Sequence, residues 1–215
     1  MTLRNTTVSY GTLAKFLHWA VASLFLAAYC AVYYRHWFTA PCPRSMELSD
    51  CAPESFITLN LHKSFGLTIA VFVVLRIIWR LLNPVPKPEP GSRLEHLGAK
   101  LGHGALYFFM IAMPITGYVS NGGGANFFWL IKIPAFWTTG LYDLLVTRGM
   151  GVEFETFSAA LEYFHHTSGA WLVWVLIVIH VAAALYHHYW KKDQTLVRIL
   201  PERLAKRFSR RGPDY

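Results

Sequence analysis

Four stretches of mostly apolar residues divide the chain, and the segments between them collect most of its charge. The stretches cover roughly residues 16–37, 57–82, 101–120 and 166–189. Each is close to the ~20 residues that an α-helix needs to cross the ~30 Å hydrocarbon core of a bilayer. The pattern predicts an all-α membrane protein: a four-transmembrane-helix bundle that forms a single membrane domain over residues 1–215.

Composition supports this prediction. Hydrophobic residues make up 54% of the chain and charged residues only 15%, whereas a soluble domain carries about 25% charged residues. The net charge of +8 is not accompanied by a nucleic-acid-binding motif. Basic groups next to membrane spans can rest on anionic lipid, so the expected contact is membrane lipid and not nucleic acid.

The distribution of charge predicts the orientation of the helices. An even number of spans puts both termini on one side, and most of the 20 lysines and arginines fall there, many of them in the basic tail 191–215. The positive-inside rule then makes both termini cytoplasmic, as in a multi-pass protein of the bacterial inner membrane. Segments 38–56 and 121–164 face outward. Cys42 and Cys51 lie in the first of them, and whether they form a disulfide stays open.

Histidines inside the apolar stretches are candidates for function, because polar side chains are costly in a membrane. Counting depth at ~1.5 Å per residue sorts them into two levels. His62 and His166 fall at the outer level, and His18 and His180 fall at the inner level. Fourteen residues separate His166 from His180, which is close to four turns and about 21 Å on one helix face. His165 is a direct rival of His166 on this reasoning.

The third apolar stretch adds a further histidine. His103 lies at inner depth and is a rival of His18.

Two matched levels of paired histidines suit two stacked b-type haems, each with two axial imidazoles from facing helices. Arg76 and Arg80 lie at the inner level and are candidates for pairing with haem propionates. No C-x-x-C-H motif occurs in the sequence, which favours non-covalent haem. Zinc fits less well, because a structural zinc site needs four ligands around one point. The glycines that would leave room for a flat cofactor are Gly66, Gly102, Gly104 and Gly169.

Several motifs resemble the bacterial cytochrome b561 family over about Thr12 to Leu200. They are "FLHW", "LHKSFG", "LGHGALY" and "IHVAAALYHHYWKKDQTLVRIL". The resemblance implies a four-helix bundle with two non-covalent haems b. It pairs His62 with His166 at the outer haem and His18 with His180 at the inner haem, and so favours His18 over His103 and His166 over His165.

A branch of that family implies a function: electron transfer from periplasmic superoxide to ubiquinone, with superoxide or another periplasmic donor as the electron source. Lys63 would then steer the superoxide anion, with Lys132 and Arg148 as further cations.

The quinone end has its own candidates. They are the quinone-binding or proton-relay residues His103, His187 and His188. Two alternative functions remain open. One is a haem b electron-transfer subunit of a larger membrane dehydrogenase or hydrogenase-type complex. The other is a histidine-based divalent metal transport protein.

Overall fold

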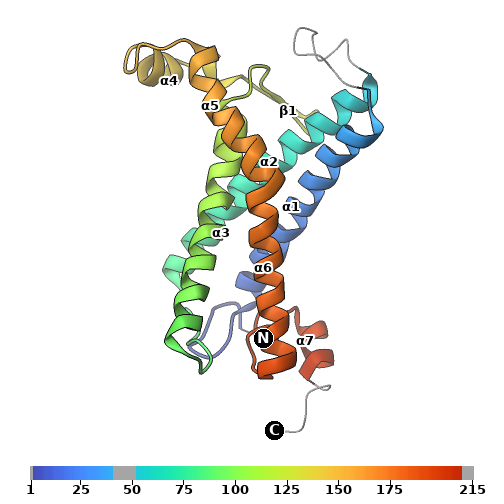
Figure 1. The fold of residues 1–215 in the computed structure, drawn as a ribbon, viewed down its shortest axis with the longest axis vertical. Helices are drawn as coiled ribbons and strands as arrows, with labels where there is room; N and C mark the ends of the chain where they lie inside the picture. Colours follow the sequence, from blue (N-terminus) through green and yellow to red (C-terminus); the bar gives the residue numbers. More distant parts are fainter. Residues whose placement is uncertain (1, 41–51, 210–215) are drawn as a thin grey trace. The chain divides into compact units, whose positions relative to one another are not determined.

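The protein is dominated by four long helical stretches, and the computed structural model describes residues 2–40 and 52–209 (Figure 1). Each of the four predicted spans coincides with a helix, and only the third, 101–120, extends past its helix, by one residue. The first three helices are α1 (Thr12–Phe38), α2 (Pro53–Leu82) and α3 (Arg93–Val119). The fourth is a continuous helix, Phe154–Lys191. Cys42 and Cys51 lie outside the described residues.

The fourth helix is not a uniform α-helix. Its α-helical parts are α5 (Phe154–Thr167) and α6 (Val173–Tyr186). Two π-helical turns interrupt or end them, η4 (Ser168–Leu172) and η5 (His187–Lys191). A π turn takes up about one residue more than an α turn and often marks a functional position. The last element is the short basic helix α7 (Glu202–Ser209).

Three of these helices are long and apolar enough to cross a membrane: α1, α2 and Phe154–Lys191. Only 11% of the most apolar window of α2 is buried in the protein. Large side chains such as Val71, Val74 and Ile78 therefore face outward, which suits lipid and not water. Helix α3 forms as predicted, but its crossing of the membrane and the cytoplasmic position of both termini stay predictions.

The described chain divides into two compact units. The first unit contains Met1–Val21, Phe72–Phe109 and Ala170–Tyr215, and the second contains Ala22–Val71 and Met110–Gly169. Each long helix therefore contributes one part to each unit. The single membrane domain inferred from the sequence stays a prediction.

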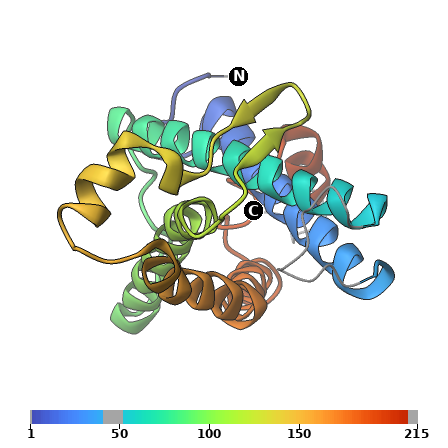
Figure 2. The ribbon, with the colours of Figure 1, turned by 90° about the horizontal axis from the view of Figure 1, so that it is seen from above.

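The segment between α3 and α5 is more ordered than the outer loop that the sequence suggests. Strands β1 (Ala125–Phe127) and β2 (Ile131–Ile133) form an antiparallel hairpin, in which Asn126 pairs with Lys132. The hairpin lies beside α2 (Figure 2). The fold is thus mostly helical but not entirely so.

Three short helical elements follow the hairpin. They are η2 (Phe136–Thr138), α4 (Gly140–Tyr142) and the π turn η3 (Asp143–Thr147). Aromatic rings join them to α5: Tyr142 lies 5.7 Å from Phe136 and 6.1 Å from Phe157, centroid to centroid. These contacts give the segment a small core of its own in the second unit.

Candidate functional site

The second unit brings two histidines face to edge. His62 on α2 and His165 on α5 have ring centroids 6.2 Å apart, with planes at 80°. Nδ1 of His62 lies 2.9 Å from the carbonyl oxygen of Ala28, and Nδ1 of His165 lies 3.0 Å from that of Met113. A carbonyl only accepts, so each Nδ1 carries the proton and each Nε2 keeps its lone pair. A hydrogen bond from the other ring nitrogen to a backbone carbonyl is the usual way in which a metal-ligating imidazole is oriented.

His166 does not join this pair. Its side chain is 71% exposed, and its Nε2 lies 3.6 Å from a carboxylate oxygen of Glu162 one turn earlier. The spacing argument for His166 assumed an unbroken α-helix. The π turn η4 adds about one residue, so four turns correspond to fifteen residues and not fourteen. The geometry therefore favours His165, the rival that the sequence left beside it.

The first unit gathers three histidines. His18 on α1 and His180 on α6 have ring centroids 6.2 Å apart. His103 on α3 lies 5.7 Å from His180 in an edge contact. Nδ1 of His18 is buried without a hydrogen-bond partner, and a buried polar atom in that state points to a missing ligand or water.

Both pairs have the separation that a shared iron requires. With metal–nitrogen distances of ~2.0 Å, two axial imidazoles place their ring centres roughly 6 Å apart. Among the residues that the structure describes, no three His, Cys, Asp or Glu side chains are grouped to hold a bare metal ion. The donor sets thus fit haem, which supplies its own four nitrogens, better than they fit zinc.

Two arginines in the unit of His18 and His180 suit the carboxylates of a haem. Arg76 and Arg80 both place their guanidinium carbon 5.7 Å from the ring centre of Tyr107. Nε of Arg76 also donates to the Tyr107 hydroxyl at 3.2 Å. Within residues 2–40 and 52–209, neither arginine forms a salt bridge with a carboxylate. Arg76 is an electrostatic neighbour of His18 and His180. An anionic group bound near these histidines would therefore balance the positive charge of Arg76.

Three of the four glycines selected from the sequence leave open space. A Cβ added at Gly66, Gly102 or Gly104 would meet no atom within 4 Å. The fourth, Gly169, is packed: its Cβ would lie 3.1 Å from the methyl carbon of Met113. The space beside the other three is compatible with a flat cofactor next to the histidines of each unit.

The two cationic side chains near His62 are both hydrogen-bonded to other parts of the protein. Nζ of Lys63 donates to the carbonyl oxygen of Gly124 at 2.9 Å, which ties it to the hairpin. Arg35, which the sequence reasoning did not select, donates from Nε to Oγ of Ser55 at 3.0 Å. Both cations are electrostatic neighbours of His62. Arg35 lies in the last turn of α1, and its place near the end of the first apolar stretch was the signal in the sequence.

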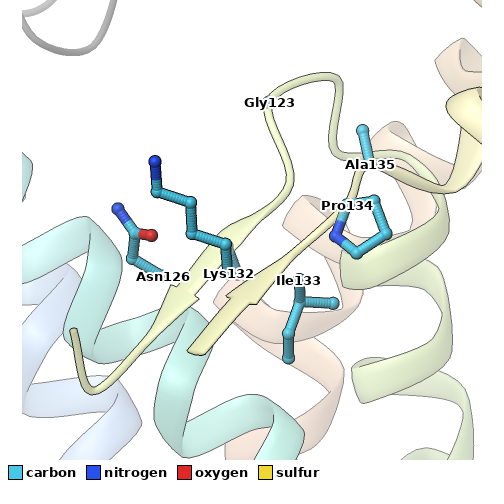
Figure 3. Close-up of a pocket in the computed structure, with 7 residues that line it drawn as sticks. Gly123, Asn126, Lys132, Ile133, Pro134 and Ala135 are labelled. Carbon is cyan, nitrogen blue, oxygen red and sulfur yellow. The ribbon is translucent and has the colours of Figure 1, made fainter. Parts of the chain in front are cut away.

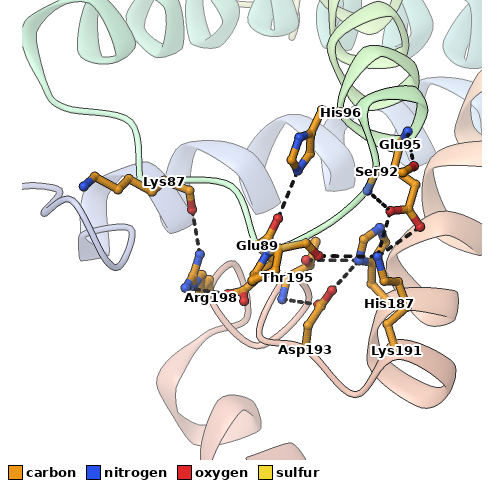
Figure 4. Close-up of polar contacts among 11 residues, drawn as sticks. Lys87, Glu89, Ser92, Glu95, His96, His187, Lys191, Asp193, Thr195 and Arg198 are labelled. Atoms are coloured by element: carbon orange, nitrogen blue, oxygen red, sulfur yellow. Dashed lines mark hydrogen bonds and ion pairs between the residues drawn. The ribbon is translucent and has the colours of Figure 1, made fainter.

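The end of the long helix carries a hydrogen-bonded network (Figure 4). Nδ1 of His187 lies 2.5 Å from Oδ2 of Asp193, and the other oxygen of Asp193 accepts from the backbone N–H of Thr195 at 2.9 Å. Burial alone would raise the pKa of Asp193, but the hydrogen bonds from His187 and Thr195 outweigh it and leave that pKa below its usual value. Lys191 pairs with Glu95 at 2.9 Å in the same network.

His188 points elsewhere: its ring lies 5.2 Å from that of Phe208 on α7. Of the histidines proposed for the quinone end, His187 is the one held by a carboxylate. Asp193 was missed by sequence reasoning, and the signal was its place just after the left-handed residue Lys192 that ends the helix.

Comparison with known proteins identifies the family of the chain. The family model described as prokaryotic cytochrome b561 matches residues 9–202. Cytochrome b561 homolog 2 of Escherichia coli is 31% identical over 208 residues, which covers 93% of this chain and 95% of the relative. The probable superoxide oxidase CybB of Yersinia pestis is 28% identical, with 90% and 97% covered. Cytochrome b562 of Cereibacter sphaeroides is 25% identical, with 90% and 96% covered. The chain therefore belongs to the prokaryotic cytochrome b561 family, whose members are membrane cytochromes that use haem b for electron transfer.

Proposed function

We propose that the protein transfers electrons through two non-covalent b haems, from superoxide outside the bacterial inner membrane to ubiquinone at the cytoplasmic side. The observation that carries the proposal is the presence of two histidine pairs, each with ring centres 6.2 Å apart and each in its own unit. We assign His62 and His165 to the outer haem, and His18 and His180 to the inner haem.

The side chains around each pair have distinct tasks. Ala28 and Met113 hold the outer imidazoles through their carbonyl groups, so that Nε2 of each faces the ligand position. Arg76 and Arg80 would bind the propionates of the inner haem. Bound haem supplies the one-electron chemistry, and the protein sets position, potential and access. With two histidines holding its iron, each haem would have no open position for a further ligand, which favours outer-sphere transfer.

Superoxide as the donor is supported by charge near the outer pair. Lys63 and Arg35 remain cationic neighbours of His62 although both are hydrogen-bonded. Lys132 is exposed. Arg148 is partly compensated, since it pairs with Asp143 at 2.8 Å. A net positive approach would raise the encounter rate with a small anion, and one relative is itself called a probable superoxide oxidase.

Quinone reduction requires protons as well as electrons. His187, held by Asp193, is the group best placed to bind a quinone oxygen or to pass on a proton. His103 touches the ring of His180, so we assign it a supporting place beside the inner haem. His188 packs on α7 and is not part of this proposal.

The direct test uses purified haem-loaded protein in liposomes that contain ubiquinone. We expect a haem content of two per chain, a bis-histidine absorbance spectrum, and quinol formation when superoxide is generated outside. The His187→Leu variant should keep both haems and lose quinol formation. Two haems with quinone reduction only after addition of a protein donor would instead identify the subunit of a larger complex. A preparation without haem absorbance after reconstitution would refute the proposal as a whole.

A further inference from the structure

The β1–β2 hairpin is attached to α2 by hydrogen bonds that replace a neighbouring strand. The side chain of Asn60 accepts from the backbone N–H of Asn126 at 3.0 Å and donates to its carbonyl oxygen at 2.6 Å. Oγ of Ser64 accepts from the N–H of Phe128 at 2.9 Å. Asn60 is only 3% exposed, and Ser64 is fully buried. Together with Lys63 on Gly124, these contacts satisfy the backbone groups along one edge of β1.

Satisfied backbone is what a hairpin needs at membrane depth. Unpaired N–H and C=O groups each cost several kcal/mol in hydrocarbon, so non-helical backbone is tolerated there only where the protein supplies partners. The partners here come from residues 60–64 of α2, a helix that is apolar and long enough to span a membrane. The hairpin is thus anchored in the first half of this helix, next to the apolar run that begins at Phe65.

The turn of the hairpin displays large apolar side chains. Trp129, Leu130 and Ile131 are 49%, 81% and 61% exposed. Phe128 and Trp129 have φ values of 44° and 60°, a conformation that costs about 1–3 kcal/mol for such residues and persists only where surrounding contacts impose it. The ring of Phe65 on α2 lies 5.6 Å from that of Phe128. The structure therefore holds the turn in a strained form that keeps its apolar side chains outside the protein.

The two faces of the hairpin differ in polarity. Asn126 and Lys132 are paired and extend from one face, where they line a hollow with Gly123 and the segment Ile133–Ala135 (Figure 3). Phe127 pairs with Ile131, one position along, and lies on the opposite face. An apolar tip with a neighbouring lysine is the arrangement of segments that lie at the boundary between headgroups and acyl chains.

We propose that the β1–β2 hairpin inserts its tip, Trp129–Ile131, into the lipid at the headgroup–acyl boundary, with Lys132 reaching the headgroups. Lipid is favoured over a protein partner because the anchor residues belong to a membrane helix and the tip carries no charge before Lys132. The inference goes beyond the proposed electron transfer and does not depend on which donor or acceptor the protein uses.

The experiment places a lipid-sensitive fluorophore at the tip. Leu130→Cys and, as the matched control, Met150→Cys are labelled in a background in which Cys30, Cys42 and Cys51 are replaced. Met150 is also exposed, at 61%, and lies in the same unit. In haem-loaded protein in nanodiscs, we expect quenching of the Leu130 label by doxyl lipids to be severalfold stronger than quenching by iodide, with the reverse at Met150. Equal, iodide-dominated quenching at both sites would overturn the proposal and leave the tip free for a protein partner.

A second measurement avoids the cysteine background. In hydroxyl-radical footprinting of the unaltered holoprotein in nanodiscs, residues 129–131 should be oxidised severalfold more slowly than Met150 after correction for intrinsic reactivity. Oxidation at the rate expected for their exposure would also overturn the proposal. The anchor is tested with Asn60→Ala, which should increase oxidation of the tip. Thr68→Ala is its control, because Thr68 bonds only to the carbonyl of Ser64 on its own helix.

Discussion

His165 and His62 lie with their ring centroids 6.2 Å apart, and each has its Nδ1 bonded to a backbone carbonyl of another helix. Met113 supplies the carbonyl for His165, and Ala28 supplies it for His62. Both Nε2 atoms are thereby available to one ligand in the same unit. This relationship makes His165 the residue on which the assignment of the outer haem depends.

Replacing His165 tests that assignment directly. His165→Ala removes one of the two imidazoles, so we expect a lower haem content and loss of the bis-histidine absorbance spectrum of the outer haem, because one of the two iron–nitrogen bonds from the protein is gone. The matched variant is His166→Ala, one position along. Its side chain is largely exposed and faces Glu162, so it should keep both haems. Haem content per chain and the reduced absorbance spectrum measure both variants. If His166→Ala lost a haem and His165→Ala kept both, the outer ligands would be His62 and His166, as the fourteen-residue spacing predicts.

The inner haem is tested by a set of three variants. His18→Ala and His180→Ala should each remove the same haem, since these rings have the separation of an axial pair. His103→Ala should keep that haem, because we assign its iron to His18 and His180 and give His103 only a supporting place beside His180. Redox titration distinguishes the two haems if their potentials differ. If His103→Ala removed the haem and His18→Ala kept it, the ligand roles of these two residues would be exchanged.

Much of this arrangement could be read from hydrophobicity and spacing. Those two features locate the helices and make His18, His62 and His180 candidates, because the depth of a residue in a helix follows from counting, but only the family resemblance favours His18 over His103. They do not distinguish His165 from His166, since the π turn η4 changes the hydrogen-bond register without a clear sign in the apolar pattern. Asp193 was missed for a similar reason: its role depends on how the chain turns after the helix.

Interactions between segments distant in sequence were also beyond the sequence pattern. In the sequence, Asn60 is a polar residue in an apolar helix with no evident role. Its partner in the structure is Asn126 of the hairpin, 66 positions later. Lys63 was selected as a cation that would steer superoxide, and nothing in the sequence indicates that its ammonium group is bonded to the backbone of Gly124. Such partners are set by tertiary packing, which hydrophobic periodicity does not encode.

Removing a cation beside the inner haem should change its reduction potential. Arg76→Gln takes away a positive charge that stabilises the reduced form, so the midpoint potential should fall, by about 1 kcal/mol or roughly 40 mV for one electron. Arg93→Gln is the control, since Arg93 is exposed at the start of α3. Potentiometric titration followed by absorbance measures both. An unchanged potential in Arg76→Gln would mean that this arginine does not lie beside the haem.

Gly117 leaves room for His165, and filling that room should disturb the outer haem. A Cβ at Gly117 would lie 2.7 Å from Cε1 of His165, so Gly117→Ala must displace the ring or α3. We expect reduced haem content or a changed spectrum of the outer haem only. In Gly123→Ala the added carbon meets no atom within 4 Å, so its spectrum should match that of the unaltered protein. Normal outer-haem binding in Gly117→Ala would show that the contact is not needed to position His165.

The Asp193–His187 contact should stabilise the end of the long helix in a pH-dependent way. The pKa of Asp193 is lower in the folded protein than its usual value, so the carboxylate stabilises the fold above the unfolded pKa of about 3.9. This stabilisation is lost as the pH falls through the lower, folded pKa. The contribution is on the order of 1 kcal/mol, because the side chain is mostly buried and is bonded at both oxygens.

The measurement compares Asp193→Asn with the unaltered protein by thermal unfolding in detergent. The variant should have a melting temperature lower by about 2–4 °C at pH 6, and the difference should become smaller as the pH is lowered to 3. Asp143→Asn is the control, since Asp143 pairs with the largely exposed Arg148 and such pairs contribute little. A difference between Asp193→Asn and the unaltered protein that persists unchanged at pH 3 would show that the carboxylate charge is not its source.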